Sequence, residues 1–227
     1  MRIIEISGLI EEGMWNYGDE LDEPIFSGPK ITELASVEKN GFSAHRIEFS
    51  ILTGTYLETG AHLLKNVKTI DCLDLKDLFL PASIIKLTKP PKSHITKQEL
   101  IKSGVQVRKG DCLIVFTGWH RMWNRKNFIL DCPHFDSDCM DWIVSKRVKI
   151  LASDTPCYDD IRDPVDSKKL PQLRKLYLNG AMALAPVVNG DKIKQGRAKI
   201  IILPLKVKSF SASPARAVVI YRSQGEL

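Results

Sequence analysis

Alternating and continuous apolar runs along the chain predict several strands. Residues 1–9 are β-branched and alternate, as expected for a first strand, and residues 42–57 have a second strand-like pattern. The run 112–117 is apolar throughout, which is typical of a strand covered on both faces. Further strands are predicted at 83–87, 148–152, 199–205 and 217–221.

Helices are predicted between these strands. Thr96 and Glu99 have the spacing of a capping box, so a helix begins at Thr96, and Gly104 ends it. A second helix is predicted to begin at Asp136 or Ser137, and a third is predicted over 172–178. The segment 69–80 is predicted to be a short helix or a turn. Because strands and helices alternate, the sequence predicts an α/β fold with a mixed sheet and flanking helices, as a single domain over residues 1–227.

Two irregular segments are candidate parts of a site. After the first strand, Gly13, Tyr17, Gly18 and Pro24 mark a long irregular excursion, and loops of that length in compact domains often cover a site. The strand 112–117 is followed by a polar and aromatic segment, and in open α/β sheets sites often lie at the carboxyl ends of strands.

Composition excludes several classes of protein. With 227 residues, 44% hydrophobic and 26% charged, the chain is of ordinary globular composition rather than disordered, collagenous or coiled-coil. The net charge of +6 comes from scattered basic residues, so no nucleic-acid partner is expected. The five cysteines never have CxxC spacing, which favours reduced thiols in a cytoplasmic protein. Glu5 interrupts the first apolar run, and no run approaches a membrane span, so no membrane association is expected.

Five stretches of the chain have the order and spacing of a known family, namely residues 5–18, 53–62, 109–119, 141–156 and 203–216. On these stretches the whole chain resembles the cyclase family of metal-dependent hydrolases, the group that includes bacterial kynurenine formamidase and isatin hydrolase. The resemblance implies a swivelling β/β/α fold, a small-molecule substrate or ligand, a homo-oligomer (dimer or tetramer), and divalent zinc or manganese as cofactor.

The family signature, His-x-Gly-Thr-His-x-Asp-x-x-x-His, falls on residues 52–62. Gly54, Thr55 and His62 match it, and Glu58 keeps the carboxylate with one more methylene. The departures are Leu52 and Tyr56 in place of the first two histidines, and Leu173 and Ala185 where the family has a further His and Glu.

These departures remove metal ligands. A metal site of this family needs imidazole and carboxylate groups about 2.0–2.2 Å from each ion, and a tyrosine with a pKa near 10 is a poor zinc ligand at neutral pH. The two-ion centre that the resemblance implies is therefore expected to be absent or heavily rebuilt. A single ion held by Glu58, His62 and water molecules would bind weakly.

Two functions remain open for such a chain. One is a hydrolase of amide or formamide C–N bonds in which His62 carries the proton, Glu58 acts as ligand or orienting base, and the Tyr56 hydroxyl donates to the developing oxyanion. The other is a catalytically silent family member that binds a ligand or a protein. Each residue also has a structural alternative: His62 as a core histidine, Glu58 as an ion pair with Lys65, and Tyr56 as a space-filling phenol.

The segment after the strand 112–117 adds candidate substrate-binding residues. Trp119 and Trp123 would either wall a pocket for a planar aromatic ligand or pack in the core. His120 and Arg121 would either meet an anionic substrate or lie in a solvated loop. Asp154 ends the strand 148–152 and is expected to hold the following turn by accepting backbone N–H bonds.

Overall fold

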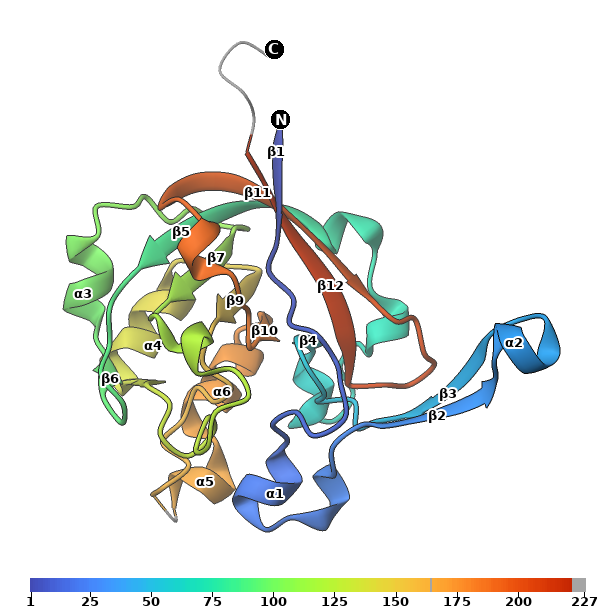
Figure 1. Ribbon diagram of the computed structural model, residues 1–227. Helices are drawn as coiled ribbons and strands as arrows, with labels where there is room; N and C mark the ends of the chain where they lie inside the picture. The colour runs from blue at the N-terminus through green and yellow to red at the C-terminus, as the bar shows by residue number, and fades with distance from the viewer. Residues whose placement is uncertain (164, 222–227) are drawn as a thin grey trace.

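The largest sheet of the computed structural model, which describes residues 1–163 and 165–221, has eight strands in the order β1-β12-β11-β5-β7-β9-β10-β4 (Figure 1). Because β12 also pairs with β4, the sheet closes into a barrel-like ring that includes all of these strands except β1. The strands are β1 (Arg2–Glu5), β4 (Tyr56–Glu58), β5 (Phe79–Lys86), β7 (Cys112–Phe116), β9 (Ile150–Ser153), β10 (Met182–Ala185), β11 (Gly196–Pro204) and β12 (Ala212–Tyr221).

The sheet is mixed, as predicted. Strands β5, β7, β9 and β10 are parallel, whereas β1, β4, β11 and β12 pair antiparallel with their neighbours. Helices α3 (Lys97–Lys102), α4 (Ser137–Ser145) and α6 (Pro171–Leu178) lie together on the outer side of the parallel strands (Figure 1). This is the α/β fold with flanking helices that the sequence predicts.

The two faces of the sheet carry different cores. Ile114 and Phe116 of β7 point into the ring, while Leu113 and Val115 point toward the helices. Strand β4 follows the same alternation because Leu57 belongs to the core inside the ring. The pairing of β4 with β10 sets Glu58 opposite Ala183 and Tyr56 opposite Ala185, and both alanines belong to the core beneath the helices. Tyr56 and Glu58 are thereby placed on the helix-covered face.

An arm formed by β2 (Lys30–Ala35), α2 (Val37–Asn40) and β3 (Ala44–Glu48) projects away from the ring (Figure 1). The prediction of one strand over residues 42–57 is wrong: β3 ends at Glu48, and β4 begins separately at Tyr56. Ile47 is exposed on the arm instead of buried in the core. An alternating pattern is satisfied equally by a hairpin outside the ring, which explains the error.

Most other predicted elements are confirmed. The capping box of Thr96 and Glu99 is formed in full, and Asp136 caps α4 through the N–H of Cys139. The segment 69–80 contains two short 3-10 helices, η3 (Ile70–Cys72) and η4 (Leu75–Asp77), before β5. Shorter elements are α1 (Tyr17–Leu21), α5 (Asp166–Lys169), β6 (His94–Ile95), β8 (His134–Phe135), and the 3-10 helices η1 (Pro24–Phe26), η2 (Gly60–His62), η5 (Trp119–Met122) and η6 (Gly190–Lys192).

The composition led to expectations about the thiols and about membrane spans. All five cysteines are free thiols in the structure. Within residues 1–163 and 165–221, no helix has the length and apolar character needed to cross a membrane.

Candidate functional site

A cavity of about 490 Å³ lies against the helix-covered face of β4 and β10. Its second wall is the irregular excursion after β1, including α1 and η1, which confirms that this excursion covers a candidate site. Most of the lining is apolar. Its apolar side chains include Leu21, Ile25, Phe26, Leu52, Ile161, Leu170, Leu173, Ala183 and Ala185, and its polar ones include Tyr17, Glu23, Tyr56, Glu58, His62, Asp159 and Lys168.

The positions aligned with the family signature converge on this cavity. Leu52, Tyr56, Leu173 and Ala185, where the resemblance expects ligands, all line it. Glu58 and His62 line it as well. The cavity is therefore the place where the expected metal ligands would have met.

Glu58 is held from two sides. Its side chain is only 4% exposed, the Tyr177 hydroxyl donates to Oε1, and His62 Nδ1 lies 4.0 Å from Oε2. Burial raises the pKa of the Glu58 carboxyl, although the His62 charge and the Tyr177 hydrogen bond oppose that rise. Tyr177 and His62 thus take the place of the alternative ion pair with Lys65.

His62 is placed by a short local motif. It ends the 3-10 helix η2, which Thr59 caps by accepting from the N–H of Ala61 at 3.3 Å. Its side chain is 24% exposed and faces the cavity, unlike that of a core histidine. The imidazole is open to proton exchange with a ligand or water, and the Glu58 carboxyl lies beside it.

Two phenols form a hydroxyl chain beside Glu58. The Tyr17 and Tyr56 hydroxyl oxygens are 2.7 Å apart, and the Tyr17 hydroxyl donates to the carbonyl of Pro156 at 2.8 Å. Burial raises the pKa of both phenols well above 10, so both keep their protons at neutral pH. Tyr56 is therefore a hydrogen-bonding group and not an anionic metal ligand.

The side chains present do not fit a two-ion centre. Leu52, Leu173 and Ala185 have no donor atom, and the Tyr56 hydroxyl is bound to Tyr17. Across residues 1–163 and 165–221, no cluster of three or more His, Cys, Asp or Glu side chains is arranged to hold a metal ion. The zinc or manganese that the family resemblance implies has no matching donor set in this cavity.

The predicted substrate-binding residues lie elsewhere. Trp119 is buried, and its indole N–H donates to the carbonyl of Phe128 at 2.8 Å. His120, Arg121 and Trp123 line a second hollow of about 420 Å³. The structure therefore does not bring these residues to the cavity of Glu58 and His62, and their contact with a substrate stays a prediction.

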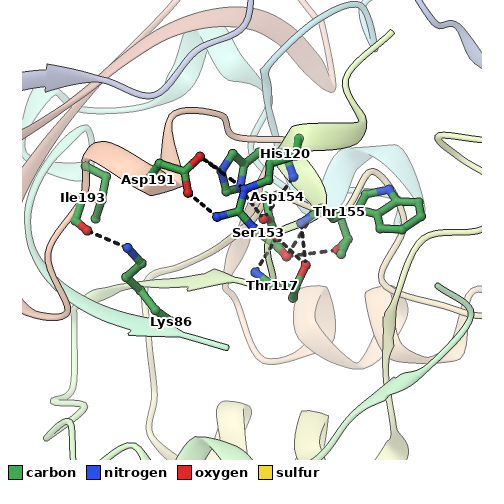
Figure 2. A network of polar contacts seen from close by, with 10 residues as sticks. Lys86, Thr117, His120, Ser153, Asp154, Thr155, Asp191 and Ile193 are labelled. Atoms are coloured by element: carbon green, nitrogen blue, oxygen red, sulfur yellow. Dashed lines mark hydrogen bonds and ion pairs between the residues drawn. The ribbon is translucent and has the colours of Figure 1, made fainter. Parts of the chain in front are cut away.

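Asp154 joins the ends of β7 and β9 in a buried network (Figure 2). Its Oδ1 accepts from the N–H and the hydroxyl of Thr117, each at 2.8 Å. Its Oδ2 accepts from the N–H of His120 at 3.2 Å and lies 2.9 Å from His120 Nδ1. On the outer side, His120 Nε2 is 3.3 Å from Asp191, which Arg121 also binds. Asp154 thus accepts backbone N–H bonds as predicted, but it holds the segment after β7 and not the turn that follows it, because the Thr155 N–H donates to the Ser153 hydroxyl.

Asp159 fixes the helix that bears Leu173 and Tyr177. Its carboxylate accepts from the N–H groups of Gln172 at 2.6 Å and Leu173 at 3.1 Å, in the first turn of α6. Burial raises the pKa of this carboxyl from 3.8 to about 6, against the lowering effect of these two hydrogen bonds.

A pH-dependent stability follows from Asp159. Because its folded pKa lies above the unfolded value, the folded chain binds the proton more tightly, and stability from this group rises as the pH falls from above 6 toward 4. As the pH falls over this interval, the unfolding free energy of the native chain minus that of Asp159→Asn should rise by up to about 3 kcal/mol. Urea unfolding at pH 7.5, 5.5 and 4.0 measures it. A constant or falling difference would contradict the assignment.

Sequence reasoning missed the partners of the candidate residues. Tyr17 lies in a stretch that carries the family resemblance, which was the available signal, but no pattern linked it to Tyr56. Tyr177 lies in the predicted helix 172–178, and its contact with Glu58 spans 119 residues. Asp159 had no local signal.

The chain is similar to known proteins over most of its length. The family model described as "Putative cyclase" matches residues 4–160. Kynurenine formamidase from Bacillus thuringiensis subsp. konkukian (strain 97-27) is 28% identical over 182 residues, covering 80% of this chain and 82% of the relative. Kynurenine formamidase from Geobacillus thermodenitrificans (strain NG80-2) is 28% identical over 206 residues, covering 88% and 93%. Isatin hydrolase A from Ralstonia solanacearum has the same fold, with a TM-score of 0.84, 16% identity, and coverage of 97% and 92%.

Proposed function

Because this chain belongs to the cyclase family, we propose that it hydrolyses an amide or formamide C–N bond of a small, largely apolar molecule, with Glu58 and His62 acting without a two-ion centre. The observation that carries the proposal is the Glu58 and His62 pair, 4.0 Å apart and facing a cavity of about 490 Å³. Its kynurenine formamidase relatives support the substrate class.

In this reaction His62 moves the proton. The imidazole accepts a proton from water while the water oxygen attacks the amide carbonyl carbon, and it then returns the proton to the nitrogen as the C–N bond breaks. The Glu58 carboxylate, fixed by Tyr177, stabilises the imidazolium between these steps. The apolar walls exclude bulk water and thereby strengthen that interaction.

Tyr56 has the role of stabilising the oxyanion. To donate to the substrate oxygen, the Tyr56 hydroxyl must turn away from Tyr17. The Tyr17 hydroxyl then turns from the carbonyl of Pro156 and donates a hydrogen bond to the Tyr56 oxygen. That rearrangement costs about one neutral hydrogen bond, roughly 1 kcal/mol. A charged oxyanion offers a stronger bond in return.

The second candidate is a silent ligand-binding protein. It is favoured by one observation, namely that the hydroxyl protons of Tyr17 and Tyr177 are already donated within the protein. Such a cavity would bind its ligand without a free donor to activate a carbonyl.

Hydrolysis of an aryl formamide by chelator-stripped protein, with and without added zinc or manganese, separates the candidates. The proposal expects turnover that is unchanged by chelator and by either metal. Turnover that requires metal contradicts the metal-independent mechanism. Binding of the formamide without turnover under every condition identifies the silent binder.

We also propose that the chain forms a homo-oligomer through the arm. Leu34 and Phe42 are exposed there, and an isolated two-stranded hairpin is marginally stable in water. The double substitution Leu34→Asp and Phe42→Asp is expected to reduce the mass measured by light scattering to that of one chain. Lys126→Glu, an exposed change outside the arm, is the control that keeps the oligomer. A native chain that is already monomeric would contradict this proposal.

A further inference from the structure

The direction of each hydroxyl hydrogen bond around the cavity can be assigned from its partner. A carbonyl oxygen only accepts, so the single proton of the Tyr17 hydroxyl is donated to Pro156. The 2.7 Å contact between Tyr17 and Tyr56 must then use the proton of Tyr56. As a result, the Tyr56 oxygen has lone pairs but no proton left for a ligand.

The other phenols near Glu58 also donate within the protein. Tyr177 donates to Glu58 Oε1, and Tyr158 donates to the carbonyl of Leu151 at 2.7 Å. Glu58 Oε2 remains as an acceptor, 4.0 Å from His62. The cavity therefore presents two acceptors, Tyr56 and Glu58, two residues apart on one face of β4.

The charged residues of the lining favour a ligand with donors as well. Glu23, Glu58 and Asp159 are acidic, while His62 and Lys168 are the basic residues of this lining. The remaining walls are mainly apolar, including Phe26, Leu52 and Leu173, which suits a hydrocarbon or aromatic body.

We propose that this cavity recognises an apolar molecule bearing an amine or amide N–H group, with the N–H donated to the Tyr56 oxygen and the Glu58 carboxylate beside it. This deepens the proposed function and rests on it, because an amine is the group released by C–N hydrolysis. A ligand whose polar group is only an acceptor, such as a carboxylate, meets lone pairs at Tyr56 unless the Tyr17 and Tyr56 hydroxyls rotate, so it binds less tightly there.

Calorimetric binding of matched probes to the full chain tests this recognition. Benzylamine, a cation at neutral pH, and neutral benzamide present N–H donors, whereas N,N-dimethylbenzamide and benzoate present acceptors on a similar ring, and the benzamide pair compares donors at equal charge. Benzylamine is expected to bind about ten-fold or more tightly than either acceptor probe. Equal binding, or tighter binding of an acceptor probe, overturns the proposal.

Two variants test the assigned proton directions. Tyr56→Phe removes the acceptor and should weaken benzylamine about ten-fold. Tyr17→Phe frees the Tyr56 proton for the cavity and leaves the lone pairs of its oxygen, so it should strengthen N,N-dimethylbenzamide and narrow the preference for benzylamine. Tyr221→Phe is the matched control, because that hydroxyl donates to the carbonyl of Lys194 outside the cavity lining, and it should leave the preference unchanged. If Tyr17→Phe leaves the preference for benzylamine as it is in the native chain, the assigned direction is wrong.

The binding and hydrolysis assays fail independently. Preference for benzylamine without formamide hydrolysis supports the recognition and rejects the proposed function. Hydrolysis with no preference between benzylamine and N,N-dimethylbenzamide supports the function and rejects the recognition. Melting temperatures of the three phenylalanine variants exclude unfolding as a cause of lost binding, and the native chain alone decides the preference between probes.

Discussion

His62→Ala should lower kcat/KM for an aryl formamide by at least about 100-fold, which is the range for loss of a general acid-base group. In the proposed mechanism His62 both accepts the proton from water and returns it to the leaving nitrogen. Initial-rate kinetics of the chelator-stripped variant measure the loss. The fold should be preserved because the side chain is 24% exposed and lies at the edge of a cavity.

Two controls accompany that measurement. His62→Gln keeps a polar side chain of similar size without a titrating ring, and it should be as inactive as the alanine variant. His94→Ala changes an exposed histidine on β6, away from the cavity lining, and should keep native kinetics. Retention of more than about one third of the native kcat/KM by His62→Ala would remove the proton-carrier role.

Asp154→Ala should lower the unfolding free energy by about 3–5 kcal/mol. The carboxylate is fully buried, and its loss leaves the Thr117 N–H, the Thr117 hydroxyl and the His120 N–H without their acceptor. Unfilled buried donors account for much of the cost. Urea unfolding followed by circular dichroism measures the change.

Asp191→Ala is the matched control for Asp154→Ala. Asp191 contacts the opposite nitrogen of the same imidazole, but its side chain is 58% exposed. Solvent screens such a pair, so only a small loss of stability is expected. Similar losses in the two variants would mean that burial of Asp154 does not determine its contribution.

Much of the sheet was predictable because buried strands carry continuous apolar runs. All of Cys112–Phe116 is buried, as that pattern requires. Strand β10 was not predicted, since Met182–Ala185 is short and rich in alanine, which has little strand preference. Part of the arm was mistaken for a strand that continued to Leu57, because the pairing of β3 with β2 satisfies the same alternation outside the ring.

The candidate site was predictable only in part. The family signature located Tyr56, Glu58 and His62, which the fold brings to one cavity. The position of Trp119 after a strand did not show whether it reaches a pocket. Its indole N–H donates to the carbonyl of Phe128 in the core. Tyr17 and Tyr177 were out of reach of a local pattern since their contacts with Tyr56 and Glu58 span 39 and 119 residues.

Calorimetric titration of zinc into chelator-stripped protein decides whether this cavity works without a two-ion centre, because Leu52, Leu173 and Ala185 put alkyl groups on its wall at positions where the family resemblance implies ligands. We expect no uptake of two ions per chain and no gain in formamide turnover during the titration. Two zinc ions bound per chain with sub-micromolar affinity, together with turnover that rises in proportion, would contradict it.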